Sequence, residues 1–164
     1  MIQKLSMNKI ILLSLLTVFF SNCNLYNVSA NYNYKTECFG IELDGSQTVK
    51  AWGTRRNRFD AVEQAKKNAV NDVIFKGINE GVQSCHMRPL IIEVQAREKY
   101  EDYFNTFFAD DGKYLEFVSL KDERILQKLN RDWVKSREGV TNGIMLRILR
   151  SDLKKQLIKD KIIN

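Results

Sequence analysis

The chain is poor in the residue types that carry most catalytic and metal-binding chemistry. It has one histidine, His86, one proline and three cysteines among 164 residues. A Ser-His-Asp or Cys-His site would have to use His86, which is adjacent to Cys85, and neighbours in sequence rarely point at each other productively. Zinc would have only Cys38, Cys85 and His86, without the ligand-pair spacing of zinc sites. The sequence therefore predicts a protein that is not an enzyme and has no metal or cofactor.

Other motifs are missing too. There is no Gly-x-Gly-x-x-Gly or Walker loop, so nucleotide binding has no support. Asp110-Asp111-Gly112 lacks the alternating acids and the closing glutamate of a calcium loop, and it predicts a turn. Proline-rich linkers, internal repeats and low-complexity tracts are also absent, which favours a single domain.

The first thirty residues carry only two charges, Lys4 and Lys9. The run from Ile10 to Phe20 is apolar except for a serine and a threonine. A basic start followed by an apolar run too short to span a bilayer comfortably is typical of a signal peptide.

Two processing sites are possible for this signal. Val28-Ser29-Ala30 has small residues where a signal peptidase reads, which predicts a signal at residues 1–30 and a single α+β domain at 31–164. Alternatively, residues 20–23 resemble a bacterial lipobox, so the signal would be residues 1–22 and Cys23 would be lipidated. Cleavage after Ala30 is favoured, because Asn22 and Phe20 match a lipobox poorly. Both processing sites predict export, to the periplasm or beyond, with membrane contact only through the signal or a lipid on an outer-membrane lipoprotein.

Charge and cysteine content agree with export. The formal net charge is +6, and loss of Lys4 and Lys9 with the predicted signal leaves +4, a mild positive charge that favours anionic partners. Export makes nucleic acid an unlikely one. Without Cys23, Cys38 and Cys85 remain, and an even pair in an oxidising compartment predicts a disulfide. Closing a loop of this length stabilises the fold by roughly 4 kcal/mol in the chain-entropy model. Two buried free thiols are the alternative.

Hydrophobic periodicity predicts an α+β fold, a single domain with an antiparallel or mixed sheet and helices packed mainly on one face. A hairpin is expected over 39–51 around an Asp44-Gly45 turn, with Gly53 ending its second strand. A helix capped by Asn57 and stopped by Gly77 follows. Further strands are expected at 90–96, 114–120 and 144–149, the last after an Asn142-Gly143 turn. Further helices are expected at 98–109, around 125–129 and after a Ser151 cap, and the aromatic residues of 98–109 are expected to pack in the core.

The stretch VKAWGTRRNRFDAVEQAKKNAV, residues 49–70, contains the one basic cluster that suggests a site. Acidic residues of the helix are expected to neutralise part of its positive charge, because Glu63–Lys67 and Asp72–Lys76 have favourable four-residue spacing. The arginines before it have no such local partner. One interpretation of these arginines is an anion-binding site, for a phosphate headgroup, a polyanionic glycan or an acidic protein. The other interpretation is a surface loop that is only solvated and has no binding role. The residues of this candidate site are Arg55, Arg56, Arg58 and Lys66.

A strand with a glycine exit at Gly53, followed by a helix with Ala61, Ala65 and Ala69 at four-residue spacing, resembles bacterial envelope domains. Examples are the N-terminal domain of flagellar assembly protein T and its lipoprotein relatives. The strand over 144–149 resembles the closing strand of these domains, and the resemblance covers about residues 46–77 and 139–150. It implies a non-enzymatic envelope module with no catalytic residues.

We therefore expect an exported, non-catalytic cell-envelope protein that binds or scaffolds another envelope component. The alternative is a secreted protein that binds a small ligand or a polyanion through the basic cluster. The pattern leaves the oligomeric state open.

Overall fold

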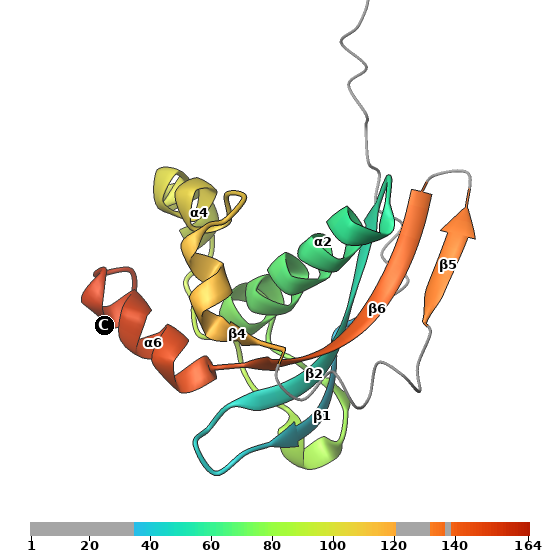
Figure 1. The fold of residues 1–164 in the computed structure, drawn as a ribbon. Coiled ribbons are helices and arrows are strands. Elements are labelled where there is room, and N and C mark those ends of the chain that lie inside the picture. The colour runs from blue at the N-terminus through green and yellow to red at the C-terminus, as the bar shows by residue number, and fades with distance from the viewer. Residues whose placement is uncertain (1–34, 121–131, 137–138) are drawn as a thin grey trace, which may run out of the picture. The chain divides into compact units, whose positions relative to one another are not determined.

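A mixed six-stranded sheet organises this computed structural model, which describes residues 35–120, 132–136 and 139–164 (Figure 1). The strand order is β3-β1-β2-β6-β4, and β5 also pairs with β6. β3 is parallel to β1 and the other pairs are antiparallel. The strands are β1 (Glu37–Ile41), β2 (Gln47–Arg55), β3 (Glu80–Gly81), β4 (Val118–Ser119), β5 (Trp133–Ser136) and β6 (Gly139–Ile148). The expected α+β class is confirmed, whereas the signal, Cys23 and the helix around 125–129 lie outside the described residues.

The helices pack on one face of the sheet. The longest helix in the described ranges is α2 (Arg58–Asn71), which continues as a π-helix, η1 (Asp72–Lys76). The others are α3 (Ala96–Lys99), α4 (Glu101–Phe107), α6 (Arg150–Lys159) and the 3₁₀ segments η2 (Gln83–Cys85) and η3 (Lys113–Phe117). Alternate residues of β2 and β6 on the α2 side are buried, while the residues between them are only half-buried. This alternation is the pattern of a sheet covered on one face.

The β1–β2 hairpin forms as expected, but Gly53 does not end its second strand. Gly45 turns the chain with φ +78° and donates to the Glu42 carbonyl at 2.9 Å. β2 continues to Arg55, with Gly53 inside the strand and paired to Asn142. Gly53 is instead where α2 comes closest, since an added Cβ would lie 2.1 Å from a helix carbonyl oxygen. The glycine marks helix–sheet contact and not a strand end.

α2 follows its sequence signals closely. The Asn57 side chain accepts a hydrogen bond from the Asp60 backbone N–H at 2.9 Å, which confirms the predicted cap. The stripe of Ala61, Ala65 and Ala69 is fully buried. Gly77, with φ +75°, ends the π-helix, and its N–H donates to the Asp72 carbonyl at 2.7 Å. Small side chains let the helix lie against the flat sheet.

The expected strand over 90–96 is wrong. Leu90 and Ile91 instead donate their backbone N–H groups to the carbonyls of Val73 and Ile74, at 3.1 and 2.9 Å. Those carbonyls lie in the last turn of the helix and have no partner further along it. The segment is therefore a cap on the end of η1, and it exposes Ile92.

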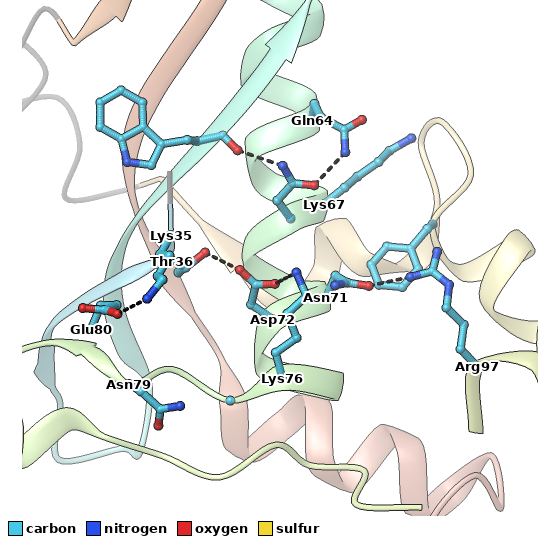
Figure 2. A pocket seen from close by; sticks show the side chains of 14 residues that line it. Lys35, Thr36, Gln64, Lys67, Asn71, Asp72, Lys76, Asn79, Glu80 and Arg97 are labelled. Carbon is cyan, nitrogen blue, oxygen red and sulfur yellow. Dashed lines mark hydrogen bonds and ion pairs between the residues drawn. The ribbon is translucent and has the colours of Figure 1, made fainter. Parts of the chain in front are cut away.

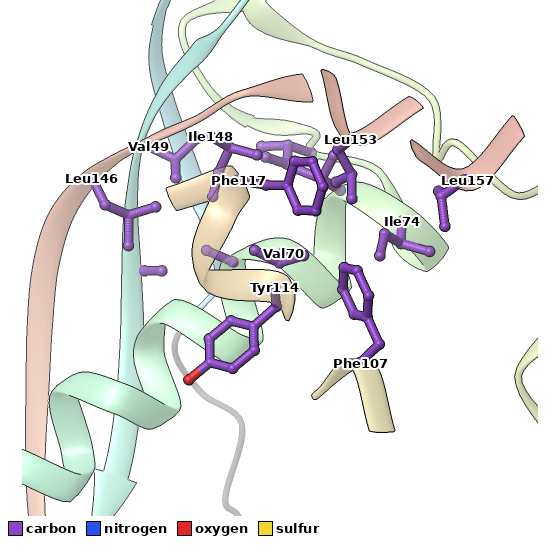
Figure 3. Packing of buried hydrophobic residues seen from close by; sticks show 14 of the residues in the cluster. Val49, Val70, Ile74, Phe107, Tyr114, Phe117, Leu146, Ile148, Leu153 and Leu157 are labelled. Atoms are coloured by element: carbon purple, nitrogen blue, oxygen red, sulfur yellow. The ribbon is translucent and has the colours of Figure 1, made fainter. Parts of the chain in front are cut away.

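Aromatic residues of the 98–109 helix enter the core, as expected, although α3 and α4 break at Tyr100. Phe104 and Phe107 are buried, and the Phe107 ring stacks on Phe117 at 6.0 Å between centroids. Figure 3 shows this cluster with strand residues on one side and α6 on the other. The strand expected over 114–120 is wrong except for β4, because residues 113–117 form the 3₁₀ turn that buries Tyr114 and Phe117.

The expected turn at Asn142-Gly143 and the expected helix cap at Ser151 are both wrong. Asn142-Gly143 lies inside β6, where Gly143 leaves room for the Trp52 ring, whose atoms would be 2.8 Å from an added Cβ. Ser151 does not cap α6, because it is already the second residue of that helix and its hydroxyl lies against Gly45. Both positions are decided by contacts with distant parts of the chain.

Cys38 of β1 and Cys85 of η2 lie at disulfide distance, with their Cα atoms 5.8 Å apart. Both are fully buried. The bridge joins the first strand to the loop after η1, as the cysteine count predicted.

Candidate functional site

The basic cluster lies where β2 passes into α2. Arg55 is the last residue of β2, Arg56 precedes the cap residue, and Arg58 is the first residue of α2. All three side chains are exposed. Figure 1 shows that the end of β2, the start of α2, the end of β5 and the start of β6 gather at one end of the sheet. We call this surface the arginine end; it comprises Arg55, Arg56, Arg58, Phe59, Trp133 and Lys135.

Strand register brings β5 into the arginine end. Arg55 pairs with Val140, and Val140 pairs with Lys135 on its other side. Residues paired across antiparallel strands point to the same face, so Lys135 lies on the face that carries Arg55. Trp133, two residues earlier, shares that face and is 47% exposed. Sequence reasoning missed both residues because only the β5–β6 pairing places them here.

The arginine end combines cations with an exposed aromatic residue. Phe59 is 74% exposed although it lies in the first turn of α2. Arg55 donates to the Gln64 side chain. Among the residues that the structure describes, Arg56, Arg58 and Lys135 form no ion pair. The cations of this surface are thus left mainly to solvent or to a partner.

Lys66, the fourth predicted member, lies apart from Arg56 and Arg58. Its ammonium group pairs with Glu63 at 2.7 Å, and its side chain is only 12% exposed. It lines a groove of about 640 Å³ together with Arg55. The groove also carries carboxylates, from Asp60, Glu63, Asp110 and Asp111. The structure therefore brings Lys66 together with Arg55 only, in surroundings where acids balance the cations.

The expected helix-surface pairs are realised in part. Asp72 and Lys76 pair at 3.0 Å, as predicted. Glu63 pairs with Lys66 and not with Lys67, because Lys67 reaches across to Asp110 at 2.8 Å. The hydrogen bond and the charge of Lys67 lower the pKa of the Asp110 carboxyl. Asp110 and Asp111 form the expected turn, which Gly112 closes with a hydrogen bond to the Ala109 carbonyl at 3.0 Å.

A second hollow, of about 480 Å³, lies along the polar side of α2 (Figure 2). Gln64, Asn68 and Asn71 line it from the helix, and Arg97 faces them from α3. Gln64 donates to Asn68 at 2.7 Å, and Asn68 donates to the Trp52 carbonyl at 2.8 Å. Sequence reasoning missed this cleft, although its signal was present as polar residues at four-residue spacing beside the alanine stripe.

The remaining candidate groups stay separate. His86 is exposed, while its neighbour Cys85 is buried and bonded. Within the described ranges, no three His, Cys, Asp or Glu residues are grouped so that they could hold a metal ion. Over the same ranges, none of the helices is long and apolar enough to cross a membrane.

Comparisons with known proteins add no relative. No protein-family model matches the chain, and neither a curated protein nor a solved structure matches it. The resemblance to the N-terminal domain of flagellar assembly protein T therefore stays a prediction.

Proposed function

We propose that this chain is an exported, non-catalytic cell-envelope protein that attaches to an anionic bilayer surface through its arginine end. The observation that carries the proposal is the group of exposed cations around exposed aromatic rings. Arg56, Arg58 and Lys135 have no carboxylate partner among the described residues. Phe59 follows Arg58 in the first turn of α2, Trp133 lies on the same face of β5 as Lys135, and both aromatic side chains are largely exposed. The positive charge of the whole chain supports the same partner.

Anionic lipid fits this combination better than a soluble polyanion does. Each lysine or arginine near an anionic membrane surface contributes about 1 kcal/mol, so four cations contribute about 4 kcal/mol. Aromatic side chains favour the headgroup region, where an apolar ring is partly buried. A polyanionic glycan would use the cations but would gain little from Phe59. The exposed ring is therefore the feature that separates the two partners.

Vesicle sedimentation tests the proposal. The protein is mixed with phosphatidylcholine vesicles with and without phosphatidylglycerol, at low and high salt. We expect binding only with the anionic lipid, and weaker binding at high salt because the charges are screened. The triple variant Arg55→Gln, Arg56→Gln, Arg58→Gln should lose most of the binding. A control that replaces Lys154, Lys155 and Lys159 of α6 by glutamine removes the same charge from another surface and should retain it.

Phe59→Ser distinguishes lipid from polyanion. It should weaken vesicle binding severalfold while leaving retention on a heparin column unchanged, because heparin offers no apolar layer. Equal losses in the arginine triple variant and in the α6 control would show attraction by net charge alone and would refute the proposal. Failure to bind anionic vesicles, with heparin binding intact, would instead favour a glycan partner.

A further inference from the structure

The cleft along α2 has features of a binding site that are separate from the arginine end. Its floor is Asp72, at the junction of α2 and η1, whose side chain is only 15% exposed. The carboxylate accepts a hydrogen bond from the Thr36 hydroxyl at 2.6 Å and pairs with Lys76 at 3.0 Å. Figure 2 shows Thr36 and Lys76 converging on this carboxylate from different segments of the chain. The floor is thus fixed before any ligand arrives. π-Helical turns of the kind that begins here are frequent at functional sites.

Arg97 supplies a positioned cation on the opposite wall. Its guanidinium group donates to the Asn71 side-chain oxygen at 2.6 Å and lies over the rings of Phe75 and Phe108, at 5.7 and 5.8 Å from their centroids. No carboxylate in the described part of the chain pairs with it. Neutral partners therefore hold the group in place and leave its charge uncompensated. A planar guanidinium in this state suits a carboxylate or a phosphate.

The rest of the lining is polar and positively charged overall. The cations of Lys35, Lys67, Lys76 and Arg97 outnumber the carboxylates of Asp72 and Glu80. The amide groups of Gln64, Asn68, Asn71 and Asn79 each offer both donors and an acceptor. A hydroxyl group also donates and accepts, so a row of amides matches a row of hydroxyls.

We propose that this cleft binds a small, hydroxyl-rich anion, a sugar that carries a carboxylate or a phosphate. Arg97 holds the acidic group, and the amides with the Asp72 carboxylate hold the hydroxyls. A volume of about 480 Å³ is within the usual range of small-ligand sites and has room for such a molecule. The site shares no cation with the arginine end, so the two binding activities are separable.

Calorimetric titration with matched probes tests this inference. Glucuronate and glucose 6-phosphate carry both features, glucose carries only hydroxyls, and acetate and inorganic phosphate carry only the charge. We expect at least one acidic sugar to bind at least tenfold more tightly than glucose and than its own free anion. The tighter of the two identifies the acidic group. If neither exceeds these partial ligands, the inference is wrong.

Variants locate the binding in the cleft. Arg97→Gln should weaken the acidic sugar at least about tenfold, since it removes hydrogen bonds to a charged group, and Arg97→Lys should be intermediate. Asn79 is exposed and lines the cleft, so Asn79→Ala should weaken binding severalfold without disturbing the fold. Arg58→Gln is the matched control, an arginine outside the cleft, and should leave the affinity unchanged.

Unchanged affinity in Asn79→Ala, together with unchanged affinity in a folded Arg97→Gln, would overturn the assignment. Vesicle binding should be intact in Arg97→Gln, which keeps this test independent of the proposed function.

Discussion

Replacing Gly53 by alanine tests the closest contact between the sheet and α2. The added methyl group would lie 2.1 Å from the Ala61 carbonyl oxygen and 2.4 Å from the Ala65 backbone nitrogen. Both atoms belong to the helix backbone, so no rotation of a side chain relieves the clash. Ordinary contacts of such a methyl group begin at 3.4 Å. α2 must therefore move away from β2 by about 1 Å at this point.

That movement opens the main helix–sheet interface. Ala65 and Ala69 of α2 are fully buried there, as are Val49 and Ala51 of β2. A gap of about 1 Å removes roughly a quarter to a half of the attraction between facing atoms. Forcing an extra methyl group into a packed core costs about 1–3 kcal/mol. Because the obstacle is backbone, we expect Gly53→Ala to lose about 3 kcal/mol, a large part of the roughly 5–15 kcal/mol that stabilises a typical domain.

Urea unfolding with the disulfide intact measures this loss. Gly40→Ala is the matched control in the neighbouring strand, since nothing lies within 4 Å of its added methyl group. It should change stability by no more than about 1 kcal/mol, in either direction. Adding Ala65→Gly to Gly53→Ala must not restore stability, because the clash is with the backbone of Ala65 and not with its side chain. Recovery in the double variant, or equal losses at the two glycines, would refute the reasoning.

Other predictions concern the disulfide, the 90–95 segment and the buried tyrosines. Replacing both bridged cysteines by serine should lower the free energy of unfolding, measured in urea, by roughly 4 kcal/mol. No loss would show that the bridge does not stabilise the fold. Ile91→Ala should lower the free energy of unfolding by about 2–4 kcal/mol, whereas Ile92→Ala should leave it nearly unchanged, because only Ile91 is buried. Equal losses would mean that both side chains are buried, as in a strand covered on both faces, and would contradict the assignment of this segment as a helix cap. Burial is the main cause that raises the pKa values of Tyr103 and Tyr114 above the ordinary 10.0. The hydrogen bond to Asp160 raises the pKa of Tyr103 further, and the charge of Glu63 raises that of Tyr114. Their neutral forms stabilise the fold, so stability should fall as pH rises above about 10. Replacing both tyrosines by phenylalanine should leave the phenolate absorbance at about pH 10 unchanged, and a loss of that absorbance would contradict the prediction.

Signals that act within one helical turn were readable in the sequence. The Asn57 cap bonds a residue three positions away, and the alanine stripe repeats every four residues. The cysteine pair was predictable because only two cysteines remain once Cys23, inside or at the end of the predicted signal, is set aside. These features depend on local chemistry or on a count. Neither kind of argument needs the position of a distant strand.

The 90–95 segment was misread because its partner lies elsewhere. A run of β-branched residues favours a strand only if a neighbouring strand offers hydrogen bonds. Here Leu90 and Ile91 find the free carbonyls of Val73 and Ile74 instead. The need to satisfy the end of a helix determined their conformation. Similarly, Asn142-Gly143 favours a turn in isolation, but the ring of Trp52 requires glycine at that point inside β6.

The sequence also indicated some residues of the candidate sites and missed others. Exposure of Arg55, Arg56 and Arg58 follows from their position on either side of the helix cap Asn57, and the sequence indicated it. Lys66 was grouped with them by sequence distance, but the helix turns it toward Glu63. The cleft was missed because its floor and its cation, Asp72 and Arg97, come from segments that meet only in the folded chain.

α2 links the fold to both proposed sites, and its geometry keeps them apart. Its alanine stripe faces the sheet, its amide stripe faces the cleft, and its first turn carries Arg58 and Phe59. Residues four apart share one face of a helix, so each stripe can change without altering the next. One side chain joins the two sites, because Gln64 accepts from Arg55 and donates to Asn68. Any influence of a ligand in the cleft on the arginine end would therefore pass through Gln64 or require α2 to move as a body, which the contact at Gly53 opposes.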